Sequence, residues 1–290
     1  MKAIYYIVGT TAVKISEVPE GTTDIAYVKP LEAVLSCNPE DGDIWISKDG
    51  DSEPWYRREL VIRPSAICID SPMGELFIWD GDSGHLCGLR IKSGVGRRVH
   101  GERALEHYSS LKKDPKALPG LRDAICHVPE GMLIACPSRH VLLLVSKDST
   151  MGTFMGGNRS GFTVATPLKS SLLSSPSGVA WDEKAETVLV ADSGNCVVRV
   201  FDILRSSGKH SVIGNPSSRV IKDGSLDKAS FALPSCIRSR SGRTVLVDSS
   251  VAVREIDFAG KAVRTLHASE RKIHSVSLDN DGQVYFLEDV

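Results

Sequence analysis

A recurring unit constrains the fold of this 290-residue chain more than any other feature, and its clearest copy is Ser175–Asp202. A Pro-Ser-Gly break opens the unit, and the β-branched run Thr187–Ala191 that follows is too short for a helix. Asp192–Asn195 has the composition of a tight turn, and Cys196–Phe201 forms the next strand. A lone meander of three strands leaves an apolar face uncovered, so the unit has to stack against others.

Fainter copies of this unit recur at a regular spacing along the chain. Pro64 begins a copy 112 residues before Pro176, and Asp80 likewise lies 112 residues before Asp192. Further copies begin near Leu31, Gly120, Pro234 and Ile273. Such self-similarity indicates a repeat architecture, in which each unit buries its apolar face against its neighbours.

The clearest copy resembles an NHL repeat. The resemblance rests on the Pro-x-Gly start, on the apolar strand that ends in Asp192, and on Asn195 and Arg199 beyond it. The connector Asp223–Pro234 resembles the segment that joins such repeats. The copies at Pro64 and Pro234 match less closely, and the resemblance spans the chain only through the repeat period. It implies a β-propeller and does not fix a function.

The two ends of the chain look like complementary parts of one blade. Ala3–Gly9 and Ala12–Val18 read as strands without a preceding Pro-Gly start, and the last copy stops after two strands at Val290. Sharing one sheet would close the ring and remove two exposed edges. An alternative register aligns Tyr5–Val18 with Thr244–Asp257, which would make the first strands the second and third of a blade.

Six repeat starts therefore predict an all-β fold: one NHL-like β-propeller domain over residues 1–290, with six blades, or seven in the alternative register. The net charge is −1, so no global field draws the chain to nucleic acid or membrane. No apolar run reaches the ~18 residues of a membrane span, and no signal peptide is evident. Seven cysteines without a CxxC pair predict free thiols in the cytoplasm or another reducing intracellular compartment.

Three long links are expected to share one face of the propeller. In an antiparallel meander, the turn between the second and third strands lies on the same side as the link to the next blade. The links 101–119, 158–175 and 215–233 should therefore lie beside the turns Asp80–Gly84 and Asp192–Asn195. Long loops on a rigid scaffold are where binding usually occurs.

The first link and the strand before it are rich in cations. The predicted binding residues are Arg97, Arg98, Arg103, Tyr108, Lys112, Lys113 and Lys116. Acidic residues dilute this charge, and a protein or peptide partner with an acidic segment is the preferred ligand. Single-stranded RNA on residues 97–116 is the alternative, because cations and an aromatic ring can hold phosphates and stack a base. A solvated short helix would explain the same residues without any ligand.

An enzymatic reading is the second alternative. Some propellers hold a metal in the channel and act as hydrolases or lyases; here His127 and His274 lie near innermost strands, but no HxH or HExxH spacing occurs. Four carboxylates recur at strand ends, which favours a structural turn role in each blade: Asp80, Asp192, Asp248 and Asp289. The sequence thus predicts a non-catalytic binding scaffold without cofactor or metal, and it leaves the oligomeric state open.

Overall fold

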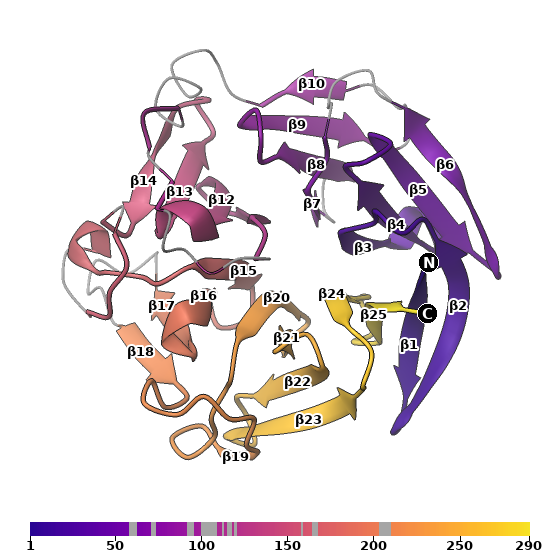
Figure 1. The fold of residues 1–290 in the computed structure, drawn as a ribbon. Coiled ribbons are helices and arrows are strands. Elements are labelled where there is room, and N and C mark those ends of the chain that lie inside the picture. The colour runs from indigo at the N-terminus through magenta and orange to yellow at the C-terminus, as the bar shows by residue number, and fades with distance from the viewer. Residues whose placement is uncertain are drawn as a thin grey trace.

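The computed structural model describes the chain except residues 58–62, 71–73, 92–95, 100–108, 112, 115–117, 119–120, 158, 164–167 and 203–209. For residues 56, 57, 70, 96–98 and 169 it describes the backbone only. The described strands form six antiparallel sheets arranged as the blades of a ring (Figure 1). The fold is therefore a six-bladed β-propeller, as the repeat starts predict.

Each blade is named here after its innermost strand. The β3 blade contains β3 (Asp24–Val28), β4 (Ala33–Asn38), β5 (Asp43–Lys48) and β6 (Asp51–Arg57), and the β7 blade contains β7 (Ala66–Asp70), β8 (Glu75–Asp80), β9 (His85–Arg90) and β10 (Gly96–Arg98). The β11 blade contains β11 (Ala124–Val128), β12 (Gly131–Cys136), β13 (Val141–Ser146) and β14 (Met151–Met155). The β15 blade contains β15 (Pro176–Asp182), β16 (Thr187–Asp192), β17 (Val197–Asp202) and β18 (His210–Ile213).

The β20 blade contains β20 (Pro234–Arg240), β21 (Arg243–Asp248), β22 (Ala252–Asp257) and β23 (Ala262–Ala268), and β19 (Gly224–Ser225) from the preceding link adds a fifth strand outside β23. Short 3-10 turns occur at η1 (Lys29–Leu31), η2 (Pro137–Arg139), η3 (Leu168–Ser170) and η4 (Ser193–Asn195). By pairing with β23, β19 covers an edge that would otherwise be open to another chain.

The remaining blade closes the ring from both ends of the chain. Its inner strands are β24 (Ile273–Leu278) and β25 (Val284–Asp289), and its outer strands are β1 (Lys2–Val8) and β2 (Thr11–Val18). β1 pairs with β25 from Lys2 opposite Asp289 to Tyr6 opposite Tyr285. The prediction of a shared blade is confirmed. The alternative register is wrong, because β1 and β2 are the third and fourth strands of their blade.

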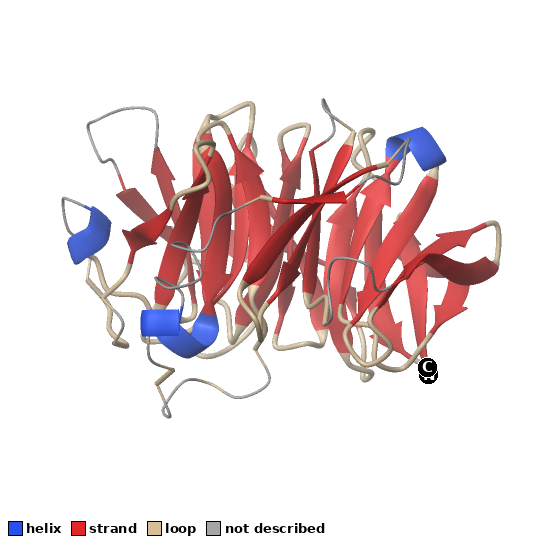
Figure 2. Cartoon of the chain, turned by 90° about the horizontal axis from the view of Figure 1, so that it is seen from above, coloured by secondary structure: helices blue, strands red, loops and turns tan. Residues whose placement is uncertain are grey.

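The blades stand around a central channel, and the ring has two distinct faces. The links between blades and the turns between second and third strands lie on one side, which we call the link face; the turns between first and second strands lie on the opposite face. Gly194 N–H, for example, donates to the link carbonyl of Ser174 (2.7 Å). In Figure 2 both chain ends lie at the lower edge of the ring, which is the link face.

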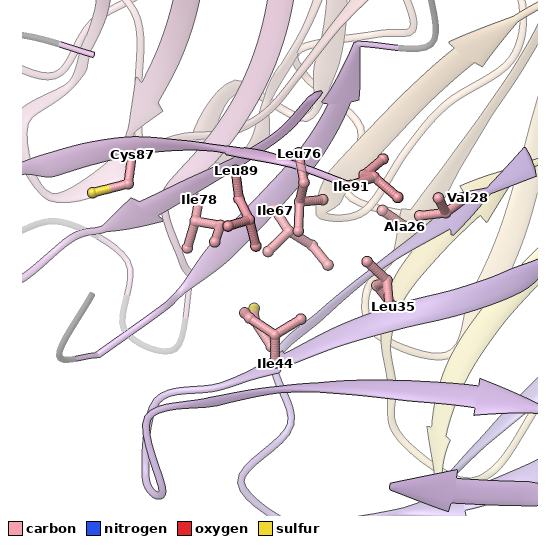
Figure 3. Packing of buried hydrophobic residues seen from close by; sticks show 11 residues of the cluster. Ala26, Val28, Leu35, Ile44, Ile67, Leu76, Ile78, Cys87, Leu89 and Ile91 are labelled. Atoms are coloured by element: carbon pink, nitrogen blue, oxygen red, sulfur yellow. The ribbon is translucent and has the colours of Figure 1, made fainter. Parts of the chain in front are cut away.

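Apolar side chains from neighbouring blades interlock to form the core. Between the β3 and β7 blades, Leu35 and Ile44 pack against Ile67, Leu76 and others (Figure 3). Burying each such side chain contributes about 1.5–3 kcal/mol, so each sheet is stabilised chiefly by the next one. Because every sheet is covered on both sides in this way, the ring holds a rigid channel at its centre.

Candidate functional site: the link face and the central channel

The Asp80 carboxylate stabilises the turn that follows its own strand. Its Oδ1 accepts hydrogen bonds from the backbone N–H groups of Asp82 (3.0 Å) and Ser83 (3.1 Å). The side chain is buried, and its only described partner from outside that turn is the Arg63 N–H, at 3.4 Å. This is the geometry expected of a structural turn residue.

Asp192 and Asp248 occupy the place of Asp80 in their own blades, but their partners differ from those of Asp80. Asp192 does not cap the backbone of turn η4: its Oδ1 accepts from the N–H of Ser174 (2.7 Å), and its Oδ2 accepts from Arg199 Nε (2.7 Å) and from the side chain of Asn195 (2.8 Å). Sequence reasoning had placed a turn cap here, and that detail is wrong. The carboxylate instead holds the link that enters the blade.

Asp248 repeats this arrangement one blade later. Its Oδ1 accepts from the link N–H groups of Ala232 (3.0 Å) and Leu233 (2.8 Å), and its Oδ2 accepts from Arg254 Nη1 (2.9 Å). Arg254 also donates to the Lys222 carbonyl (3.0 Å). Both carboxylates therefore fix links, and each does so together with a buried arginine.

The two arginines turn the second and third links into straps. Arg199 donates to the carbonyls of Thr163 (2.7 Å) and Leu172 (2.8 Å), and its side chain, like that of Arg254, has no exposed surface. Phe162 remains partly exposed beside the Arg199 guanidinium, 4.7 Å from its ring centre. The described parts of these links are thus tied to the ring by charged hydrogen bonds rather than held as open loops.

Asp289 departs from the turn role expected for it. It accepts from His274 Nε2 (2.7 Å), and no turn N–H bonds to its side chain among the residues described. Burial lowers the pKa of His274, while the hydrogen bond to Asp289 opposes that shift. This pair ties the first two strands of the closing blade together at the link face.

The predicted basic binding residues are only partly placed. Arg103, Tyr108, Lys112 and Lys116 lie outside the described residues. Arg97 and Arg98 lie on β10, the outermost strand of the β7 blade, where only the backbone is described. Lys113 is exposed in the first link, next to Asp114, whose N–H donates to the Ser138 carbonyl on the link face. The proposed cluster therefore stays a prediction.

The channel opens on the link face through a small polar cavity of about 150 Å³. Arg122 and Lys272, which precede the innermost strands β11 and β24, line this mouth together with Ser250 from the β21–β22 turn. Arg122 and Lys272 are exposed, and neither forms an ion pair within the described chain. Their repulsion adds to burial in lowering the pKa of Lys2. The mouth thus brings together two cations that have no ion-pair partner in the described chain.

Sequence reasoning missed Arg122 and Lys272. Each is a single basic residue directly before an apolar strand. This arrangement is common, so it does not indicate a ligand. The available signal was positional: both stand at repeat starts, and repeat starts converge on the channel mouth of a propeller. Only the ring geometry brings residues 150 positions apart to one cavity.

An ion pair forms the waist of the channel. Arg238 Nη2 lies 2.9 Å from both carboxylate oxygens of Asp24. Asp24 also accepts from the Ser275 hydroxyl (2.6 Å) and from the backbone N–H of Ile67 (3.0 Å). One carboxylate therefore joins inner strands of four blades, β3, β7, β20 and β24.

A larger cavity of about 400 Å³ opens on the opposite face. Its walls are mostly apolar side chains of the inner strands, and Tyr27, His127, Trp181 and Arg240 stand near its rim. The His127 ring stacks on Phe77 with 5.7 Å between centres. His127 thus lies at the opposite end of the channel from His274, so these two histidines cannot share one metal ion.

The described residues contain no group of three or more His, Cys, Asp or Glu side chains placed to hold a metal ion. All seven cysteines are free thiols. Three of them, on inner strands, are half-buried beside the channel: Cys68, Cys126 and Cys236. Burial raises the pKa of Cys236, which disfavours the reactive thiolate. These thiols act as small packing groups in this fold.

Fold and channel together define a β-propeller with a charged mouth on its link face. Solved structures support the fold. A protein of unknown function from Bacteroides thetaiotaomicron aligns over 99% of this chain and 76% of its own, with 12% identity and a TM-score of 0.68. A gluconolactonase from Xanthomonas campestris aligns over 98% and 94%, with 10% identity and a TM-score of 0.63.

A chain of a nidogen/laminin complex is similar over 92% of this chain and 94% of its own, with 13% identity and a TM-score of 0.62. At these identities the similarities concern the fold alone. No protein-family model matches the sequence, and no curated protein matches it. Within the described part of the chain, no helix is long and apolar enough to cross a membrane.

Proposed function

We propose that this NHL-like propeller is a non-catalytic scaffold that binds an acidic segment of a protein partner on its link face. The observation that carries the proposal is the pair Arg122 and Lys272 at the channel mouth, two cations without an anionic partner in the described chain. An uncompensated positive patch on a nearly neutral protein attracts acidic ligands and guides their approach. Lys113 lies on the same face, in the first link.

The rigid straps support a binding role for this face. Because Arg199 and Arg254 fix the described parts of the links 158–175 and 215–233, these parts of the link face keep their places before a partner arrives. Preorganised surfaces lose less conformational entropy on binding. The free thiols fit a reducing intracellular compartment, where such a partner would be met.

Partner capture from native cell extract tests the proposal. Arg122→Glu combined with Lys272→Glu should fold normally, because exposed charges contribute little stability, and should lose most of the captured partner. Lys184→Glu combined with Lys261→Glu makes the same change of charge at exposed turns of the opposite face and serves as the control.

Equal capture by the wild type and the Arg122/Lys272 variant would overturn the proposal. Loss of capture in the control alone would place binding on the opposite face. Capture that nuclease treatment abolishes would show that RNA, not protein, is the ligand; such binding should also fall steeply with salt.

A further inference from the structure

The proposed function leaves open which acidic group enters the mouth, and the geometry restricts the answer. The cavity of about 150 Å³ is smaller than the ~300–1,000 Å³ of typical ligand pockets, so it suits one compact group rather than a whole organic molecule. Its donors come from three blades, with Arg122 before β11, Ser250 in the β20 blade and Lys272 before β24. All three residues line the one cavity.

We propose that the link-face mouth binds a single tetrahedral dianion of the phosphate or sulfate class, held by Arg122, Lys272 and Ser250. The inference rests on the proposed function and names the chemistry of its anchor, a phosphorylated side chain of the partner. Two cations without an ion-pair partner in the described chain balance one dianion, whereas a carboxylate would neutralise only one of them. Arginine is suited to such a group because its fork of N–H donors matches two of the oxygens.

The other charged groups that line or border the mouth have hydrogen-bond or ion-pair partners of their own, so they do not need the ligand. Asp24 is paired with Arg238 (2.9 Å), and Asp123 accepts from Trp79 Nε1 (2.8 Å). His274 donates to Asp289, a residue just outside the cavity lining. Lys2, buried nearby, donates to the Thr22 carbonyl (2.6 Å). Arg122 and Lys272 are therefore the cations of the lining that have no ion-pair partner in the described chain.

Some hydroxyl groups around the mouth already have a hydrogen-bond partner within the fold, whereas the Ser250 hydroxyl does not. Ser65 donates to the Trp79 carbonyl and Ser177 bonds to Ser193, so both serve the fold. The Ser250 hydroxyl has no hydrogen-bond partner among the described residues. It is half-exposed on a left-handed turn residue (φ 58°), which leaves its O–H free to donate to an oxyanion.

Titration calorimetry with inorganic sulfate, at constant ionic strength set by chloride, tests the site on the full chain. Sulfate stays a dianion across neutral pH, so its charge is not a variable. Arg122→Gln with Lys272→Gln should weaken sulfate binding at least about tenfold, since opposite charges near contact are removed. Ser250→Gly, which suits the positive φ, should weaken it about threefold. Lys184→Gln with Lys261→Gln should leave it unchanged.

A second readout locates the ion. Sulfate at the mouth should raise the pKa of Lys2 in nuclear magnetic resonance titrations, because it screens the repulsion from Arg122 and Lys272. Equal sulfate affinity in the wild type and in the Arg122/Lys272 variant, or an unmoved Lys2 titration at saturating sulfate, would overturn the inference.

Peptide arms separate the sources of the dianion and the two proposals. A phosphoserine peptide flanked by acidic residues should bind more tightly than its serine and glutamate versions and should compete with sulfate. Sulfate binding without any peptide binding would support the inference for a free anion and count against the protein partner. Binding of the glutamate peptide without sulfate binding would support the proposed function and overturn the dianion site.

Discussion

The β7 blade and the two later blades, β15 and β20, carry an aspartate at the same point, yet the three carboxylates do different work. Asp80 bonds mainly to its own turn, whereas Asp192 and Asp248 reach back to the incoming link. The difference follows from one residue of the third strand, the one that pairs with the second strand two positions before the aspartate. Arg199 and Arg254 face Val190 and Leu246, and the same place in the β7 blade is taken by Cys87, which faces Ile78. One side chain on a neighbouring strand therefore decides whether a carboxylate holds a turn or a strap.

The largest expected effect comes from breaking a strap. Arg254→Met should cost about 3–5 kcal/mol of unfolding free energy, because it leaves the buried Asp248 carboxylate unpaired and removes donors from the link carbonyls. Chemical denaturation followed by circular dichroism measures this. Arg199→Met should behave alike, and a loss below about 1 kcal/mol in both would show that the straps are incidental.

Asp123, a buried carboxyl that forms no ion pair within the described part of the chain, should show an intermediate, pH-dependent effect. Burial raises the pKa of Asp123 to about 6, despite the hydrogen bond from Trp79. Since this lies above the ~3.9 of an unfolded chain, the stability that the proton contributes is full below pH ~3.9 and is lost as the pH rises through about 6.

Asp123→Asn should remove this dependence. Its unfolding free energy should gain about 1–3 kcal/mol relative to the wild type between pH 4 and pH 7. Urea denaturation at a series of pH values provides the measurement, and parallel curves for the two proteins would contradict the assignment.

The smallest effect is expected at the turn carboxylate. Asp80→Ala removes the acceptor of two turn N–H groups and of the Arg63 N–H, and should cost about 0.5–2 kcal/mol. Asp192→Ala, measured beside it, should cost clearly more because Arg199 would then be buried without its partner. Equal losses at the two positions would contradict the distinction between turn and strap.

The propeller itself could be predicted because its repeats are local. Short apolar runs, Pro-Gly breaks and strand-ending carboxylates occur close together in the sequence, as in Ser175–Asp202. The partial copies at the two ends indicated the shared blade. The roles of Asp192 and Arg199 could not be predicted in detail, because the arginine's other acceptors are carbonyls of Thr163 and Leu172, which carry no side-chain signal. The mouth was missed for a similar reason: Arg122 and Lys272 meet only when the ring closes.

The blade that contains β1 and β25 also affects the order in which the chain can fold during synthesis. Ala3 pairs with Glu288, so β1 is synthesised long before the strand with which it pairs. Until β25 arrives, one edge of β1 stays unpaired, and the waist pair has to bring Asp24 to Arg238 across most of the chain. Contacts of such long range slow folding and prolong the exposure of strand edges. Before β1 pairs with β25 and closes the ring, the open edge of β1 is therefore exposed to pairing with another copy of the chain.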